Sequence, residues 1–141
     1  MKHPKQKRKY YTIDEANSTL PLLRAILRDV TALAHELREC DQRRRRLESS
    51  GSSGAAHEEE VQRLHEELER DQERLHECED ELKKLHVELK DYFTGLIDFP
   101  CWMDDHEVYL CWKLDEPEVS HWHELDSGFT GRQKLSQQVL S

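Results

Sequence analysis

The sequence predicts a mainly α-helical protein, in which a long antiparallel helical hairpin, or coiled coil, carries a small C-terminal β-hairpin head. Two long charged segments have hydrophobic residues at alternating steps of three and four, which is the pattern of a coiled coil. A Gly/Ser-rich linker over residues 49–56 separates these two segments. After them, a segment rich in Trp, His and Cys alternates apolar and polar residues, which indicates strands.

The composition supports this fold class. Of the 141 residues, 35% are hydrophobic and 36% are charged, a balance that favours helices burying one narrow stripe over a thick globular core. The formal net charge of −9 does not favour binding to nucleic acid. No segment resembles a signal peptide or a membrane span, so we expect a cytoplasmic protein whose four cysteines are free thiols or metal ligands.

We divide the chain into a basic tail over 1–10, a helical hairpin over 11–96, a head over 97–135 and a second tail over 136–141. The first tail is predicted to be disordered and the second frayed, because neither can bury much apolar area.

The first helix is predicted to begin at the capping box Thr12-Ile-Asp-Glu15. Pro21 comes too late to belong to the first turn, so we expect a break or kink near Thr19-Leu20. A long helix should follow from Leu20. Its hydrophobic stripe consists of Leu23, Ile26, Val30, Leu33, Leu37, Cys40 and Leu47.

The second helix is predicted to begin near His57 and to end at the stop signal Thr94-Gly95. Only Asp71 interrupts its stripe, which consists of Val61, Leu64, Leu68, Leu75, Cys78, Leu82, Leu85, Leu89, Tyr92 and Leu96. Two helices joined by one flexible linker pack antiparallel. Because such a hairpin buries little area per residue, we expect a homodimer to cover its outer flanks.

The head is predicted to contain two strands, 108–113 and 117–124, joined by a turn at Asp115-Glu116. In this register Tyr109 faces Trp122, a favourable cross-strand pair.

Four segments resemble the DUF2203 family of small bacterial proteins, which has no assigned function. These segments are Tyr11-Thr-Ile-Asp-Glu-Ala-Asn-Ser-Thr-Leu-Pro-Leu-Leu, Gly95-Leu-Ile-Asp-Phe-Pro, Leu110-Cys-Trp-Lys and Trp122-His-Glu-Leu-Asp-Ser-Gly-Phe-Thr-Gly-Arg. The resemblance covers about Tyr11 to Leu135. It implies a cytosolic bacterial protein and supplies no catalytic residue, substrate or cofactor.

A metal site is the first candidate for chemistry in the head. His121 and His123 are alternate residues, so their imidazoles leave the same face of a strand and could share one Zn²⁺. The predicted register places Cys111 on the opposite face. A third ligand could come from Cys101, Asp104, Asp105, His106 or Glu124. The alternative is that the two histidines pack against apolar neighbours, since no CxxC or HExxH motif accompanies them.

A small-anion or ligand site is the second candidate. Gly128-Phe-Thr-Gly-Arg132 offers backbone amides beside a guanidinium, which suits a carboxylate or phosphate. Asp98 lies in an apolar stretch and must be paired or hydrated, its expected partners being Arg132 or a histidine of the head. The candidate ligand-binding residues are Asp98, Trp112, Glu124 and Arg132. The alternative is a structural turn in which Arg132 pairs with Asp126 or Asp98.

Nucleophilic catalysis would need Cys111 or Cys101 beside a histidine, with a lowered thiol pKa. A buried strand cysteine is more often inert, and no catalytic residue is predicted. We therefore expect a non-enzymatic interaction or scaffold protein that presents the Trp side chains of its head to a partner protein. The alternative is a metal- or anion-binding head whose enzymatic activity is left open.

Overall fold

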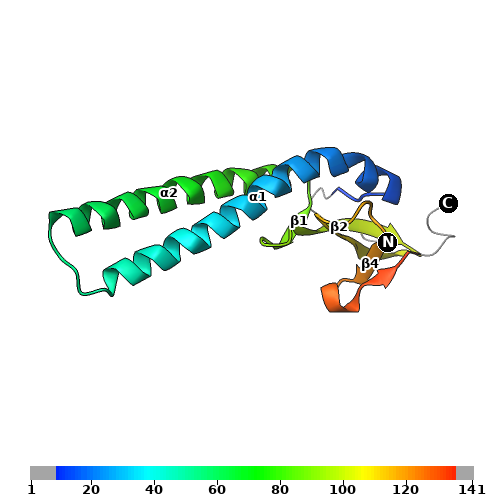
Figure 1. Cartoon of the computed structure of the whole chain (residues 1–141). Coiled ribbons are helices and arrows are strands. Elements are labelled where there is room, and N and C mark those ends of the chain that lie inside the picture. Colours follow the sequence, from blue (N-terminus) through cyan, green and yellow to red (C-terminus); the bar gives the residue numbers. More distant parts are fainter. Residues whose placement is uncertain (1–8, 136–141) are drawn as a thin grey trace.

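The computed structural model describes residues 9–135 and contains two long helices followed by a five-stranded antiparallel sheet (Figure 1). The prediction of a mainly helical coiled coil with a small β-hairpin head is therefore wrong, because the sheet and the helices share one hydrophobic core. Of the two predicted tails, only Lys9 and Tyr10 belong to the described residues. Neither described helix has an apolar stretch long enough to cross a membrane.

Helix α1 (Ile13–Glu48) begins with the predicted capping box. The backbone amide of Glu15 donates to Thr12 Oγ1 at 3.1 Å, and the amide of Thr12 donates to Glu15 Oε1 at 2.9 Å. The expected break before Pro21 is absent, and the helix runs through this residue. Pro21 is exposed, so water can hydrate the carbonyl that its missing N–H leaves free, while Leu20 and Leu23 beside it are buried in the core.

Helix α2 (Ala55–Lys84) packs antiparallel to α1 but ends about ten residues earlier than the three-four spacing predicts. The chain turns at His86, whose φ is 62°, and then enters strand β1 (Glu88–Asp91). Leu89 and Tyr92 keep the spacing of the helical stripe, yet they pack on the core from a strand and a turn. Local spacing alone could not reveal this change, because both structures bury the same residues.

Strands β2 (Leu96–Met103), β3 (His106–Lys113), β4 (His121–Glu124) and β5 (Gln133–Lys134) complete the sheet in the order β1-β2-β3-β4-β5. The longest paired segment is the β2–β3 hairpin, which the sequence analysis missed. Its turn residues Asp104 and Asp105 have φ of 50° and 63°, the left-handed conformations of a tight two-residue hairpin turn.

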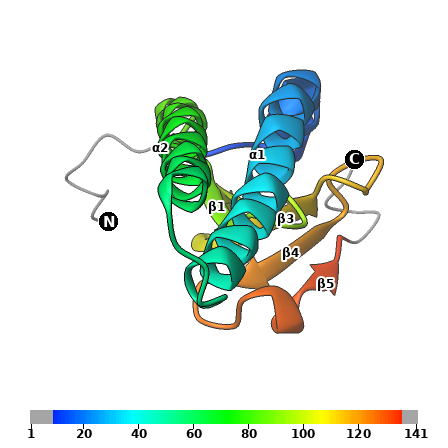
Figure 2. The ribbon, with the colours of Figure 1, turned by 60° about the vertical axis from the view of Figure 1, so that its left-hand side comes forward.

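The two faces of the sheet have different surroundings. One face carries Ile97, Phe99, Leu110 and Trp112, which pack with α1 in the main core. Figure 2 shows the helices lying over this face, while the segment after β4, with the short helix η1 (Phe129–Gly131), lies on the other side of the sheet.

The β3–β4 register differs by one residue from the prediction, since Tyr109 pairs with His123 and Leu110 pairs with Trp122. A one-residue shift exchanges the two faces of a strand. Cys111 therefore lies on the same face as the two histidines, not on the opposite one.

The connection between β3 and β4 explains this register, because contacts with α1 hold it as a long loop. The guanidinium of Arg24 donates to the carbonyls of Glu116 and Pro117, at 3.3 and 2.7 Å. The amide of Val119 donates to Asn17 Oδ1 at 2.7 Å. The chain turns at Leu114-Asp115, one residue before the predicted turn, and the amide of Glu116 donates to the carbonyl of Lys113 at 2.9 Å. Strand β4 begins only at His121, so residues 117–120 do not belong to a strand as predicted.

Candidate metal centre

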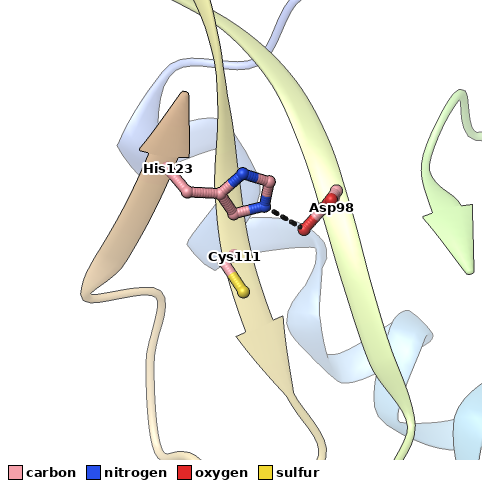
Figure 3. A group of neighbouring side chains, drawn as sticks. All are labelled: Asp98, Cys111 and His123. Atoms are coloured by element: carbon pink, nitrogen blue, oxygen red, sulfur yellow. Dashed lines mark hydrogen bonds and ion pairs between the residues drawn. The ribbon is translucent and has the colours of Figure 1, made fainter. Parts of the chain in front are cut away.

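Three buried polar side chains converge on the sheet face away from the helices. They are Asp98 on β2, Cys111 on β3 and His123 on β4, with exposed fractions of 3%, 0% and 2%. One ligand atom from each lies within 4.8 Å of the other two. Figure 3 shows the imidazole of His123 reaching from β4 across β3 toward Asp98.

The sheet register produces this convergence. Asp98 lies directly opposite Cys111 in the β2–β3 ladder. His123 lies opposite Tyr109, two residues before Cys111 on the same strand face. The ring of His123 packs at a tilt on the ring of Tyr109, with 5.5 Å between centroids, which directs the imidazole toward β2.

Both nitrogens of His123 have partners. Nδ1 lies 2.8 Å from the backbone carbonyl of Glu124, and Nε2 lies 3.0 Å from Asp98 Oδ1. A carbonyl can only accept, so the network assigns the hydrogen of the neutral ring to Nδ1 and leaves Nε2 facing the carboxyl. A backbone carbonyl on the far nitrogen is the arrangement that commonly orients metal-binding histidines.

The environment of Asp98 favours a shared proton. Burial raises the pKa of the Asp98 carboxyl, and the hydrogen bond and charge of His123 offset only part of this rise. The 3.0 Å contact between Nε2 and Oδ1 is a hydrogen bond only if one hydrogen lies between the two atoms, so Asp98 and His123 share one proton when no cation is bound. A metal ion at this position would take the place of that proton.

Cys111 is not an activated nucleophile. Burial, followed by the charge of Asp98, raises the pKa of its thiol to about 12. Burial also raises the pKa of Cys101 to about 11, and Cys101 belongs to the main core. Neither thiol has the lowered pKa that a Cys-His dyad requires, whereas a bound metal ion deprotonates a coordinating thiol directly.

A cavity of about 450 Å³ adjoins the three-residue group. Asp98 and His123 belong to its lining, and so does Lys113 of β3. Leu125 and Phe129, from the segment after β4, cover it. The group is therefore buried in the sheet but borders a partly open cavity that could hold a small molecule.

Arg132 is not one of the three converging ligands but borders them, because its guanidinium also forms a side-chain hydrogen bond with the Cys111 thiol, whose pKa is raised by burial and lowered in smaller part by this hydrogen bond. Its guanidinium makes a two-pronged contact with the carboxylate of Glu116, at 2.8 and 2.9 Å, and also donates to the carbonyl of Cys111 at 3.2 Å. Burial raises the pKa of Glu116, but the hydrogen bonds from the Arg132 guanidinium and from the backbone amide of Lys113 outweigh it and hold the pKa below its ordinary value. Arg132 thus pairs with neither Asp126 nor Asp98, and it fastens the covering segment to β3.

His121 also lies apart from His123. Its Nδ1 is 3.1 Å from Ser120 Oγ and 3.9 Å from Glu116 Oε2. Burial and the charge of Arg132 lower its pKa. The two histidines share a strand face but have different neighbours, and only His123 belongs to the three-residue group.

The remaining predicted residues lie elsewhere. Glu124 contacts His106 Nε2 at 3.1 Å, on the exposed surface. Trp112 is fully buried on the opposite face, where its Nε1 donates to the carbonyl of Glu116 at 3.0 Å. The other suggested third ligands are separated too: Cys101 packs in the core, and Asp104 and Asp105 form the β2–β3 turn.

The sequence predicted Arg132 or a histidine of the head as the partner of Asp98 and predicted His123 as a metal ligand, but it did not count Asp98 as a metal ligand and it placed Cys111 on the opposite face. Asp98 does have one of the partners that the sequence predicted, a histidine of the head. The sequence does contain a Cys, an Asp and a His in three apolar segments that form neighbouring strands. Only the correct register of these strands shows that the three side chains meet.

The fold and the group define a class of protein: an α+β protein whose helical hairpin covers one face of a sheet and whose other face carries a candidate metal centre. The chain belongs to the family DUF2203, described as "Uncharacterized conserved protein", whose model matches residues 9–135. The resemblance found in the sequence motifs is thereby confirmed over nearly the whole chain. Comparison with curated proteins and with solved structures gave no match.

Proposed function

We propose that the protein binds a Zn²⁺ ion through Asp98, Cys111 and His123, and that its sheet serves as a metal-binding domain. The observation that carries this proposal is the convergence of a carboxyl, a thiol and an imidazole, all buried, with ligand atoms within 4.8 Å. Asp98 and His123 already bond to each other, and a shared metal ion would bond the Cys111 thiol to them as well.

The donor set favours zinc over harder cations. Sulfur, nitrogen and oxygen donors together suit Zn²⁺, whereas Mg²⁺ and Ca²⁺ prefer oxygen alone. Bond lengths of about 2.0–2.3 Å place neighbouring ligands of a tetrahedral Zn²⁺ about 3.3–3.6 Å apart. The 3.0 Å contact between Asp98 and His123 would open slightly, and separations of up to 4.8 Å would close by at most about 1.5 Å.

Three protein ligands suggest a zinc site that binds water or substrate, as distinct from a purely structural zinc site. Structural zinc sites have four protein ligands, while sites that bind water or substrate use three and keep one position open. Asp98 and His123 line the cavity of about 450 Å³, so the open position would be reached from that space.

The direct test is metal content. Protein purified without added metal and without chelator should contain about one Zn²⁺ per chain by elemental analysis. The apo protein loaded with Co²⁺ should show the near-ultraviolet charge-transfer absorption of a thiolate ligand, and Cys111→Ala should lose that band. Cys78→Ala, which removes a half-buried helical cysteine, is the matched control and should keep it. Failure of the apo protein to bind Zn²⁺ or Co²⁺ would exclude the proposal.

The helical hairpin supports a second proposal, self-association with another copy of this chain. A groove of about 700 Å³ between the helices is lined by apolar side chains that include Leu37, Leu68 and Leu75. Arg38 lines it from α1 and Glu69 from α2, so two copies related by a two-fold axis can bring unlike charges together.

Phe93, at the end of this groove, is 41% exposed and would be covered by the second copy. Light scattering should then give the mass of a dimer, and Leu68→Glu should reduce it to that of a monomer. A wild-type monomer at micromolar concentration would exclude this proposal.

A further inference from the structure

We propose that the cavity beside the metal centre binds a small organic dianion, which places one carboxylate on Lys113 and offers the other to the metal ion. This inference rests on the proposed zinc site and adds the class of ligand. Three observations support it: Lys113 lines the cavity, the other charged groups of the cavity have partners of their own, and apolar side chains cover the cavity.

Lys113 is placed to act together with the metal ligands. It lies two residues after Cys111 on β3, so its side chain leaves the same face of the sheet about 7 Å further along the strand. It lines the cavity that Asp98 and His123 also line. A ligand in this space can therefore contact the metal position and the Lys113 ammonium together.

Among the residues that the structure describes, the ammonium of Lys113 has no anionic partner, whereas that of Lys90 has one. Within residues 9–135, no carboxylate forms an ion pair with Lys113 Nζ, which instead lies 5.6 Å from the centroid of the Phe129 ring. Lys90, the other lysine of the cavity, contacts Glu88 at 3.0 Å. Lys113 is thus the cation available to an anionic ligand.

The two carboxylates that line the cavity contact other groups, and within residues 9–135 neither forms an ion pair with Lys113. Asp91 Oδ1 accepts hydrogen bonds from the amides of Phe93 and Thr94, at 2.8 and 3.4 Å, so it caps the β1–β2 turn. Asp98 contacts His123 and is assigned to the metal. The end of the cavity near Lys113 therefore favours an anion, while the end near Asp98 holds the cation.

The apolar side chains that cover the cavity favour a ligand with a carbon chain. Leu125 and Phe129 line the cavity, and their exposed fractions of 48% and 40% are high for large apolar side chains. Gly128, between them, has φ of 63°, a conformation that favours glycine and forms the bend in the cover. A short carbon chain between two carboxylates would contact these apolar groups.

The test uses Zn²⁺-loaded full-length protein and a series of dianions: malonate, succinate and glutarate. Isothermal titration should show that one of the three binds at least about tenfold more tightly than acetate, since the second carboxylate adds a charge-assisted hydrogen bond. Succinamate, in which an amide replaces one carboxylate of succinate, should bind as weakly as acetate. This comparison separates recognition of two charges from simple coordination of one carboxylate.

Two lysine variants locate the effect. Lys113→Gln should keep its Zn²⁺ content and lose the preference for the dianion, whereas Lys90→Gln, whose ammonium is already paired, should retain the preference. If Zn²⁺ binds but none of the dianions exceeds acetate, or if Lys113→Gln keeps the preference, the inference is wrong and the zinc site stands. If the wild-type protein binds no Zn²⁺, the proposed function itself fails.

Discussion

His123 Nε2 lies 3.0 Å from Asp98 Oδ1 in the interior of the sheet, while the opposite nitrogen of the same ring donates to the carbonyl of Glu124 at 2.8 Å. The imidazole is therefore held by a backbone partner on one side and presents its other nitrogen to a carboxyl and a thiol. Residues from three strands form this arrangement, so it depends on the sheet register and on no local motif.

Asp98→Asn should separate metal binding from folding. An amide can donate to Nε2 of the neutral His123 ring, so the hydrogen bond survives and the free energy of unfolding of the apo protein should change by less than about 1 kcal/mol. The amide is a poor zinc ligand, however, and the thermal stabilisation by added Zn²⁺ should disappear. Differential scanning calorimetry with and without Zn²⁺ measures both effects. Equal zinc stabilisation of the variant and the wild type would argue against Asp98 as a ligand.

His123→Ala should be much more destabilising than His121→Ala. The first change leaves the buried Asp98 carboxyl without its partner, for which we expect a loss of about 3–5 kcal/mol. His121 contacts Ser120 and the edge of the Glu116 carboxylate, so its truncation should cost about 1 kcal/mol or less. Urea unfolding of both apo variants provides the comparison. Similar losses for the two would mean that the contact with Asp98 contributes little to stability.

The pair formed by Arg132 and Glu116 should fasten the cover of the cavity. Both side chains are mostly buried, with exposed fractions of 14% and 16%, and their contact is two-pronged. Arg132→Met and Glu116→Gln should each destabilise the protein by about 1–3 kcal/mol, and the double variant by less than the sum. A double-mutant cycle from urea unfolding measures the coupling. Strict additivity would show that the two residues act separately.

The capping box of α1 should make the protein less stable as the pH falls into the acid range. The amide of Thr12, followed by the ammonium of Lys9, holds the pKa of Glu15 below its ordinary value of 4.5. Because the pKa of Glu15 is lower in the folded state, the charge of Glu15 stabilises the fold. This stabilisation is complete above the unfolded-state pKa and is lost as the pH falls through the folded-state pKa.

Glu15→Gln keeps the geometry of the capping box without the charge, and it serves as the comparison. The wild type should therefore melt at a higher temperature than Glu15→Gln at neutral pH, and the difference should vanish well below pH 4.5. A difference that persists unchanged in acid would contradict the role of the charge.

Local features of the chain were readable from the sequence alone. The capping box at Thr12 and Glu15 specified the start of α1, because it involves only residues three apart. The motif combination identified the family, whose model matches 9–135. The Gly/Ser-rich stretch marked the connection between the helices, which extends over residues 49–54. In each case the relevant interactions or motifs are close in sequence.

The end of α2 and the register of the sheet required the tertiary structure. Leu89 and Tyr92 continue a helical spacing, yet they occupy a strand and a turn, because packing on the core decides between two structures that bury the same residues. The register of β4 depends on Arg24 and Asn17 of α1, which bond to the distant β3–β4 loop. Since a shift of one residue exchanges the faces of a strand, these contacts from another layer determine that Cys111, His123 and Asp98 meet.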